Sequence, residues 1–247
     1  MTHSKLPSLA VVLPCFNEAP NVTAAVAQAR AAAAANARDH EIVVVDDGST
    51  DGTREIAATL AALDPHVRLV AHPSNRGYGA AVRSGIAATT ADWVLLTDAD
   101  LQFDLEDLAR FVPLAFAHDL VLGFRSRRAD RWSRRLAAHA WNRLMRASFG
   151  VRGRDVDCAF KLVRGPALRA LPLSSDGAMI STELLVRSAQ AHWRTAELAV
   201  EHRPRVAGEP TGGDPRVIAR AFGELLALRR QLRAERDAGT HARPTVA

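Results

Sequence analysis

The feature that most constrains this chain is a repeated alternation of short apolar runs and longer helix-forming stretches in its first half. The apolar runs are rich in Val and Leu, and the stretches between them are rich in Ala. Continuous apolar strands that alternate with helices are typical of a parallel sheet covered on both faces. The sequence therefore predicts an α/β fold with a mostly parallel central sheet flanked by helices. The expected strands are Leu9–Leu13, Glu41–Val45, Val67–Ala71, Asp92–Leu96 and Asp119–Leu122, and the expected helices are Asn21–Ala35, Thr53–Leu63 and Tyr78–Thr89.

The alternation ends after about Gly123, where an arginine-rich segment follows. Beyond it we expect a strand, a helix and a strand, then a Gly/Pro-rich loop, a basic amphipathic helix and a disordered tail. These segments are Val156–Val163, Ser181–Ala191, Thr195–Val200, Arg203–Pro215, Val217–Arg236 and the residues from Ala238 on. The predicted organisation is an N-terminal extension over residues 1–8, a main domain over 9–212 and a C-terminal helix with a flexible tail over 213–247.

The net charge and the cysteines limit the kind of binding partner and the cellular compartment, but they do not identify the partner. The net charge of +5 suits phosphates, nucleic acid or an anionic membrane surface. Cys15 and Cys158 lie far apart, without metal or disulfide spacing, which favours a reducing compartment. No stretch approaches the roughly 18 apolar residues of a membrane span. We expect a cytoplasmic protein that touches a membrane without crossing it.

Polar clusters follow three of the predicted strands at the points where they end. The first strand runs into Pro14–Glu18, the second into Asp46–Thr53 and the fourth into Asp98–Gln102. In open α/β sheets, ligands bind outside the carboxyl ends of the strands. The sequence therefore predicts a binding site at this edge.

The last of these clusters has the chemistry of a metal site. Asp98 and Asp100 are two residues apart, so on an extended segment they point the same way. Two carboxylates held that close repel each other unless a cation lies between them. Oxygen ligands favour Mg²⁺ or Mn²⁺, and Gln102 can add a neutral oxygen. An Asp-x-Asp also occurs in solvated loops and helix caps, but its position after a buried strand favours metal.

The segment Asp46–Thr53 has two interpretations. Asp51 or Ser49 can cap the next helix, and we interpret Asp51 as structural. Asp46 and Asp47 end an apolar strand, where a carboxylate can accept from a base N–H or a ribose hydroxyl.

The glycine-rich segment after the third strand and the histidines do not predict a dinucleotide site or a catalytic triad. Asn75–Val82 resembles a dinucleotide fingerprint, but Val82 replaces its third Gly and it follows the third strand. We interpret Gly77 and Gly79 as letting a helix start approach a ligand or the sheet closely. The scattered histidines suggest no Ser-His-Asp arrangement and are interpreted as surface residues.

Four motifs in this order resemble family-two glycosyltransferases, and within them the dolichol- or polyprenyl-phosphate mannosyltransferases and glucosyltransferases. The motifs are Pro14-x-Phe16-Asn17-Glu18, Asp46-Asp47-Gly48-Ser49-x-Asp51-Gly52-Thr53, Asn75-x-Gly77-x-Gly79 and Asp98-Ala99-Asp100-x-Gln102. The similarity extends from about Leu9 to Gly208. It implies a GT-A fold, an inverting mechanism and a divalent metal, Mg²⁺ or Mn²⁺.

The resemblance also implies residue roles. The catalytic residues would be Asp98, Asp100 and Arg125, and the metal would be held by Asp100, Gln102 and Asp98. The donor-contacting positions are matched by Pro14, Phe16, Glu18, Val45, Asp47, Asp98, Ala99, Asp100 and Arg205. Asp157–Lys161 occupies the place of a segment near the acceptor side. Two departures concern the donor: Phe16 stands where many members have Tyr, and Gly208 is followed by Glu209 rather than by Ser-Lys.

Six arginines lie within eleven residues, from Arg125 to Arg135. They are Arg125, Arg127, Arg128, Arg131, Arg134 and Arg135. One interpretation is a solvated basic surface. The other is a phosphate cradle beside a membrane, with Trp132 and Trp141 at the interface and with Arg125 and Arg134 on the acceptor phosphate. The helix Val217–Arg236 either lies on the bilayer or packs on the domain.

These features predict transfer of a hexose, mannose or glucose, from a GDP-mannose or UDP-glucose type donor to a polyprenyl or dolichyl phosphate at the inner face of the membrane, with no nucleic-acid partner. An acceptor phosphate is already anionic, so no strong general base is required. The main alternative is transfer to a hydroxyl of a soluble saccharide or small molecule, which needs a base. A nucleotidyltransferase and a catalytically silent nucleotide-sugar binding protein fit the motifs less well.

Overall fold

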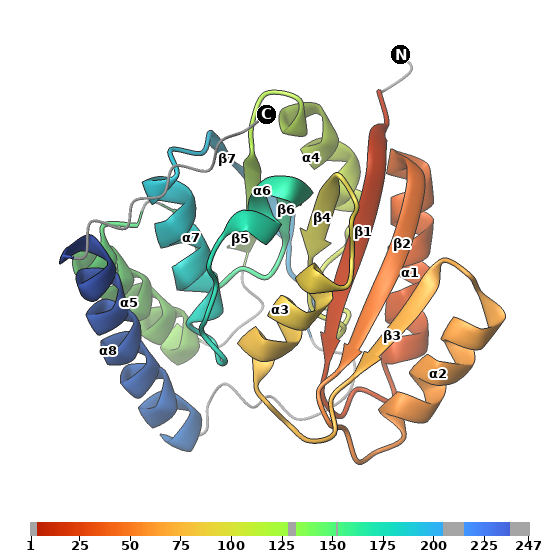
Figure 1. Ribbon diagram of the computed structural model, residues 1–247, viewed down its shortest axis with the longest axis horizontal. Helices are drawn as coiled ribbons and strands as arrows, with labels where there is room; N and C mark the ends of the chain where they lie inside the picture. The colour runs from red at the N-terminus through yellow and green to blue at the C-terminus, as the bar shows by residue number, and fades with distance from the viewer. Residues whose placement is uncertain (1–3, 128–131, 152, 205–214, 238–247) are drawn as a thin grey trace.

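The computed structural model describes residues 4–127, 132–151, 153–204 and 215–237. Within these residues the chain forms a seven-stranded sheet in the order β3-β2-β1-β4-β6-β5-β7 (Figure 1). Every pairing is parallel except those of β6, which runs antiparallel to β4 and β5. The predicted mostly parallel α/β sheet is confirmed. The strands are β1 Leu6–Cys15, β2 Ala37–Asp46, β3 Val67–Ala71, β4 Trp93–Leu96, β5 Leu120–Arg127, β6 Lys161–Arg164 and β7 Thr195–Glu201.

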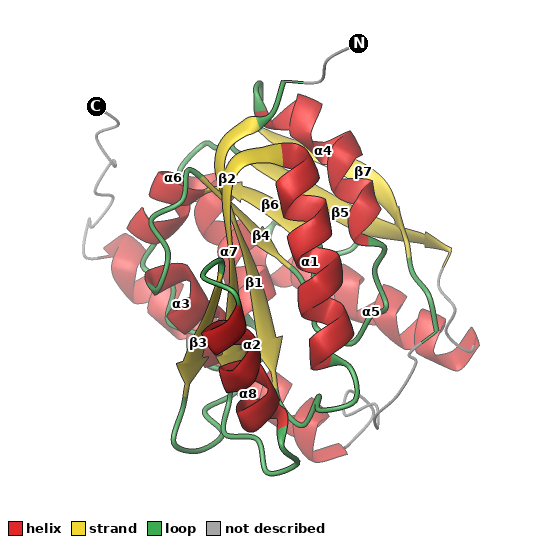
Figure 2. Cartoon of the chain, turned by 90° about the vertical axis from the view of Figure 1, so that its right-hand side faces the viewer, coloured by secondary structure: helices red, strands yellow, loops and turns green. Residues whose placement is uncertain are grey.

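Helices cover both faces of the sheet, and α1 and α4 lie over one of them (Figure 2). Side chains alternate between the two faces of a strand, so Leu9, Val11 and Leu13 of β1 pack on the side of α1, while Val12 packs on the opposite side. The helices are α1 Val22–Asn36, α2 Thr53–Leu63, α3 Tyr78–Ala87, the 3₁₀ turn η1 Leu105–Asp107, α4 Leu108–Ala115, α5 Trp132–Phe149, α6 Gly165–Ala170, α7 Ile180–Gln190 and α8 Pro215–Asp237.

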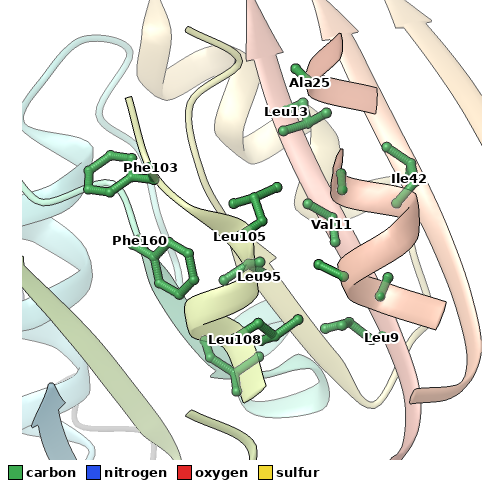
Figure 3. Close-up of a cluster of buried hydrophobic side chains, with 14 of the residues drawn as sticks. Leu9, Val11, Leu13, Ala25, Ile42, Leu95, Phe103, Leu105, Leu108 and Phe160 are labelled. Carbon is green, nitrogen blue, oxygen red and sulfur yellow. The ribbon is translucent and has the colours of Figure 1, made fainter. Parts of the chain in front are cut away.

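The core on the α1 side gathers residues from distant parts of the chain (Figure 3). Leu95 of β4 lies among Leu105, Leu108 and Phe160, all of them buried. This packing fixes the loop after β4 and the segment before β6 relative to each other. Burial of each such side chain contributes about 1.5–3 kcal/mol to folding, so the site at the ends of these strands rests on a rigid base.

The structure changes several predicted element boundaries. β2 begins at Ala37, directly after α1, because β1 pairs with it over its whole length from Leu6↔Ala37 to Cys15↔Asp46. The strand predicted at Val156–Val163 is instead Lys161–Arg164, because its pairing with β4 covers only the four residues from Lys161↔Leu96 to Arg164↔Trp93. Helices α5 and α6 were not predicted from the sequence. Helix α5 begins inside the arginine-rich segment.

Helix α8 packs on the domain. Leu225, Leu228 and Leu232 are buried in the core cluster that also contains Ile180 and Leu184 of α7. Residues of the expected loop at 205–214 and of the expected tail from Ala238 lie outside the described residues. No helix in the described part of the chain is long and apolar enough to span a membrane.

Candidate active site

The register of the central strands brings the predicted polar clusters to one edge. β1 lies between β2 and β4 and pairs in parallel with both. Cys15 is paired with Asp46, and Val12 with Leu96, so the loops after these three strands emerge side by side. The expectation from the sequence, that the three clusters meet, is confirmed.

The reversed strand β6 adds residues from later in the chain. Lys161, its first residue, is paired with Leu96 of β4 and Leu122 of β5. β5 therefore runs parallel to β4, and Arg125 near its end lies at the same edge. The segment after β7 also reaches this edge, because the Arg203 backbone N–H donates to the Gln102 carbonyl at 2.8 Å.

Asp98 lies at the centre of this edge. Its Oδ1 atom is buried and has no hydrogen-bond partner among the described residues. Burial raises the pKa of the Asp98 carboxyl, and a hydrogen bond from Tyr78 and the charges of Lys161 and Arg125 oppose that rise. A buried carboxylate oxygen without a partner is costly, so this atom fits a cation that arrives with a ligand.

Tyr78 and Lys161 are site residues to which the sequence analysis assigned no role. Lys161 is buried, and its ammonium donates to the Cys158 carbonyl and, at 3.3 Å, to the Ser181 hydroxyl. The pKa of Lys161 lies below its ordinary value, because burial outweighs the opposing effect of the neighbouring acidic groups, Asp98 among them. The available signal was a lysine at the start of the apolar run that forms β6.

The loop after Asp98 holds Asp100 and Gln102 in a fixed conformation. Asp100 is buried and accepts from the Gln102 backbone N–H at 3.1 Å, while Leu101 between them has a φ of 61°. Such left-handed geometry is rare for a branched residue and is common at functional sites. The Gln102 side-chain N–H donates to the Arg203 carbonyl at 3.2 Å, which fixes the orientation of the amide.

Asp98 and Asp100 fit a divalent cation that is shared with a substrate. The described residues hold no cluster of three or more His, Cys, Asp or Glu side chains able to hold an ion. Mg²⁺ typically binds one or two carboxylates and completes its shell with substrate phosphates and water. A site of two carboxylates beside an open edge corresponds to that pattern.

The loops after β1 and β2 are bonded to each other. The Asn17 backbone N–H donates to the Ser49 hydroxyl, and the Asn17 side-chain oxygen accepts from Thr50 N–H, both at 2.9 Å. Asn17 has a φ of 56°, and the next residue, Glu18, donates its N–H to the Thr53 hydroxyl at 2.8 Å. These bonds fix Phe16, whose ring stays 42% exposed.

Two other residues of this region were assigned roles from the sequence. Asp51 accepts from the Thr53 N–H at 3.0 Å and its hydroxyl at 2.5 Å, at the start of α2. This agrees with the structural role expected for it. Glu18 is buried and accepts from the Asn21 side chain at 2.6 Å.

Asp47 is buried among protein donors. Its Oδ1 accepts from Arg76 N–H at 2.9 Å and lies 2.6 Å from His72 Nδ1, and its Oδ2 accepts from Gly77 N–H at 2.8 Å. The predicted donor contact of Asp47 stays a prediction. The expectation that the histidines lie on the surface is wrong for His72 and His202, which are buried.

Three of the remaining predicted donor positions lie in or directly after the strands that end at this edge. Pro14 is the register partner of Val45, which is fully buried, and Ala99 is buried between the two aspartates. Arg205 lies outside the described residues, and of Arg134 only the backbone is described, in α5.

Arg125 is held by a partner that the sequence analysis did not single out. Its Nε and Nη2 atoms lie 2.6 and 2.8 Å from the two carboxylate oxygens of Asp155. The side chains of Arg125 and Asp155 are 16% and 5% exposed. Burial alone would lower the pKa of Arg125, but the Asp155 carboxylate raises it above its ordinary value. A fixed guanidinium with its outer edge directed away from Asp155 is suited to an anionic oxygen group.

The start of helix α3 packs closely against the loop that contains Ser175 and Gly177. A side chain at Gly79 would overlap the carbonyls of Ser175 and Gly177. This places the helix start against that loop rather than against the sheet. The loop itself is fixed by the buried Glu183, which accepts from Ser175 N–H at 2.8 Å and from Arg187 Nε at 2.8 Å.

Comparison with known proteins shows the family of the chain. The Glycosyl transferase family 2 model matches residues 10–170. The undecaprenyl-phosphate 4-deoxy-4-formamido-L-arabinose transferase of Aeromonas hydrophila is 31% identical over 216 residues, which cover 86% of this chain and 65% of that protein. The enzyme of the same name from Edwardsiella ictaluri is 32% identical over 213 residues, covering 85% and 64%. The chain thus spans a little under two thirds of the length of these relatives.

Solved structures show the same fold. Glucosyl-3-phosphoglycerate synthase from Mycobacterium tuberculosis in complex with phosphoglyceric acid matches with a TM-score of 0.68 at 20% identity, over 90% of this chain and 79% of that one. The same enzyme with Mn²⁺ and UDP-glucose matches with a TM-score of 0.66 at 19% identity, over 90% and 78%. The predicted GT-A fold is confirmed.

The buried Arg125–Asp155 pair leads to a stability prediction. Asp155→Ala leaves a buried guanidinium without its partner, and we expect a loss of about 3–5 kcal/mol in the free energy of unfolding. Asp64→Ala is the comparison, because its ion-pair partner Arg30 is 57% exposed, and an exposed pair contributes far less than a buried one. Urea unfolding of both variants measures the difference. Equal losses would show that Asp155 does not hold Arg125 in a desolvated pair.

Proposed function

The chain belongs to glycosyl transferase family 2, and from that membership we propose that it is an inverting, metal-dependent glycosyltransferase that moves a sugar from a nucleotide-sugar to a polyprenyl phosphate. The observation that carries the proposal is the meeting of an acidic pair, Asp98 and Asp100, with the fixed guanidinium of Arg125 at one sheet edge. The acidic pair suits a metal–diphosphate complex, and the guanidinium suits a second phosphate. The relatives are named as undecaprenyl-phosphate transferases, which supports the same acceptor class.

On the donor side, Asp98, Asp100 and Gln102 would hold Mg²⁺ or Mn²⁺ together with the donor diphosphate. When bound, the cation neutralises the charge that develops on the leaving phosphate. The structural neighbour with Mn²⁺ and UDP-glucose supports a metal of this kind. Tyr78 orients Asp98 through a hydrogen bond, and the positive charge of Lys161 partly balances the charge of Asp98.

The nucleotide lies along the ends of β1 and β2. The exposed ring of Phe16 offers a face for the base, and the carboxylates of Glu18 and Asp47 accept from base or ribose. Pro14, Val45 and Ala99 form the backbone floor of this half of the site, and Arg205 contacts the donor phosphates.

On the acceptor side, Arg125 and Arg134 bind the lipid phosphate. An oxygen of that phosphate attacks the anomeric carbon from the face opposite the donor diphosphate. The bond from this carbon to the diphosphate breaks, the nucleoside diphosphate leaves, and the configuration of the carbon is inverted. The attacking oxygen is anionic at neutral pH, since the second pKa of a phosphate ester is about 6. The chain therefore has to position the two phosphates rather than remove a proton.

The sugar we propose is a hexose, mannose or glucose, on a GDP-mannose or UDP-glucose type donor. The relatives are named for 4-deoxy-4-formamido-L-arabinose, a modified pentose. A donor screen must therefore include pentose and hexose nucleotides.

We place the enzyme at the cytoplasmic face of the membrane through α8 and its neighbour α5. Phe222 and Leu226 of α8 are 47% and 52% exposed, and the Phe222 ring packs edge-on against Trp141 of α5 at 5.7 Å. Arg229, Arg230 and Arg233 are exposed further along α8. Apolar side chains next to basic ones are the pattern of an interfacial helix on anionic lipid.

The first prediction from this proposal concerns the metal. EDTA should abolish sugar transfer, and Mg²⁺ or Mn²⁺ should restore it. Asp100→Asn should lower the restored rate by about 100-fold or more, because it removes a charged ligand worth several kcal/mol. Asp92→Asn is the control, because Asp92 is bonded to Ser8 at the opposite end of β1. Full activity in chelator would refute the metal site.

The second prediction concerns the acceptor. With labelled nucleotide-sugars and undecaprenyl phosphate, the label should enter the organic extract. Arg125→Lys should raise the acceptor KM or lower kcat by about 10-fold or more, because an ammonium lacks the bidentate geometry. Arg68→Lys, with a 58% exposed side chain, should be unaffected. Label found only in water-soluble saccharide would replace the lipid acceptor with a hydroxyl acceptor.

The third prediction concerns the membrane. The protein should sediment with phosphatidylglycerol vesicles at 0.1 M salt and be released at 1 M, as the Debye length falls from about 10 Å to about 3 Å. The double variant Phe222→Ser, Leu226→Ser should bind markedly less. Leu63→Ser is matched to it, because Leu63 is 78% exposed at the end of α2. If both variants bind like the wild type, α8 is not the contact surface.

A further inference from the structure

A chain of three polar side chains, two buried and one half-buried, lies beneath the nucleotide half of the site. His72 follows directly after β3 and is 5% exposed. Its Nδ1 atom lies 2.6 Å from Asp47 Oδ1, and its Nε2 atom lies 2.9 Å from the Ser84 hydroxyl of α3. Because a carboxylate only accepts, Nδ1 carries the proton toward Asp47. In the neutral ring Nε2 then accepts from the Ser84 hydroxyl.

The order Asp-His-Ser is also that of a nucleophilic triad, but the position of Ser84 argues against that role. Ser84 lies inside α3 (Tyr78–Ala87), and its carbonyl accepts from the Ala88 N–H at 3.1 Å. The backbone around it is engaged in the helix rather than turned toward a bound oxyanion. The three side chains instead connect the loop after β2, the segment after β3 and helix α3.

The segment that His72 begins is packed directly on the loop after β2. The His72 backbone N–H donates to the Asp46 carbonyl at 2.9 Å. A side chain at Gly48, which has a φ of 75°, would overlap the backbone of Ser74 and Asn75. The two loops therefore form one surface at the end of β2.

Asp47 is the group that joins these two loops. Besides His72, it accepts from the backbone N–H groups of Arg76 and Gly77. Gly77 directly precedes Tyr78, whose hydroxyl is hydrogen-bonded to Asp98. The orientation of the Asp47 carboxylate thus fixes both the nucleotide side of the edge and the start of the helix that reaches the acidic pair.

We propose that His72 is a positioning residue of the donor site, which orients Asp47 and holds the segment 72–77 in the conformation that receives the nucleotide. His72 does not touch the donor and acts through Asp47. The inference rests on the proposed function, since it assumes that the ends of β1 and β2 bind a nucleoside diphosphate.

Two amide substitutions separate the two bonds of the ring. In His72→Asn the amide N–H group is placed near the position of Nδ1, so the bond to Asp47 is kept and the bond to Ser84 is lost. In His72→Gln the longer side chain reaches the position of Nε2, so Ser84 keeps a partner and Asp47 loses one. The measurement is the Kd for UDP and for GDP in the presence of Mn²⁺, by calorimetry, together with the Tm of each variant.

We expect His72→Asn to bind the nucleotide within about twofold of the wild type. His72→Gln should bind about tenfold more weakly, because Asp47 and the segment 72–77 are then no longer held in the conformation that receives the nucleotide. Ser84→Ala should resemble His72→Asn, and His118→Gln, on a histidine bonded to the Leu114 carbonyl, should be unchanged. A purely structural role would lower the Tm of both amide variants and leave both Kd values unchanged.

Equal Kd values for His72→Asn and His72→Gln, or weaker binding by His72→Asn, would overturn the inference and leave the proposed function intact. If the wild type itself binds neither UDP nor GDP with Mn²⁺, the proposed function fails and the inference fails with it. If His72→Gln does not fold, Ser84→Ala still tests the inference, since a tenfold loss of affinity there would contradict it.

Discussion

The parallel pairing of β1 with both β2 and β4 is the constraint on which the rest of the structure depends. This pairing runs from Leu6↔Ala37 to Cys15↔Asp46 on one side and from Leu9↔Trp93 to Val12↔Leu96 on the other. Because side chains alternate along a strand, a shift of one residue would turn the apolar set of β1 to the wrong face. The same register determines which loop residues meet. Core packing and site geometry are therefore set by one arrangement of backbone hydrogen bonds.

Gathering so many polar groups at one edge has an energetic cost that the loops largely offset. Asp46 is fully buried but is bonded to Arg54 at 2.8 Å, and Asp47 is satisfied by three donors. Asp98 Oδ1 is different, since it is buried without a partner in the described part of the chain. A buried unsatisfied group of this kind is expected at a functional or strained site. A cation bound there would recover the free energy lost.

The sequence predicted the elements of the first half, because apolar runs and strand-end polar clusters are local signals. β3 was predicted at its observed bounds, and the meeting of the three clusters followed from the parallel topology. Asp155 and His72 were not assigned roles, because each acts through a partner far away in the chain. The rule applied to the other strand ends would have drawn attention to His72, which directly follows β3. Helix α5 was missed because its arginines masked an apolar stripe that includes the buried Met145.

The pairing of Arg125 with Asp155 keeps this arginine from forming an ion pair with the aspartates at the same edge. An arginine at the same edge as two aspartates is attracted to them, and its charge does act on Asp98. If Arg125 bonded to Asp98, it would occupy the oxygen that a cation needs and would withdraw from the acceptor side. Asp155 supplies a nearer carboxylate in bidentate geometry, at 2.6 and 2.8 Å, and so keeps the guanidinium apart from the acidic pair. Under the proposed function, Asp155 is thus a carboxylate that keeps Arg125 available for a phosphate without binding a phosphate itself.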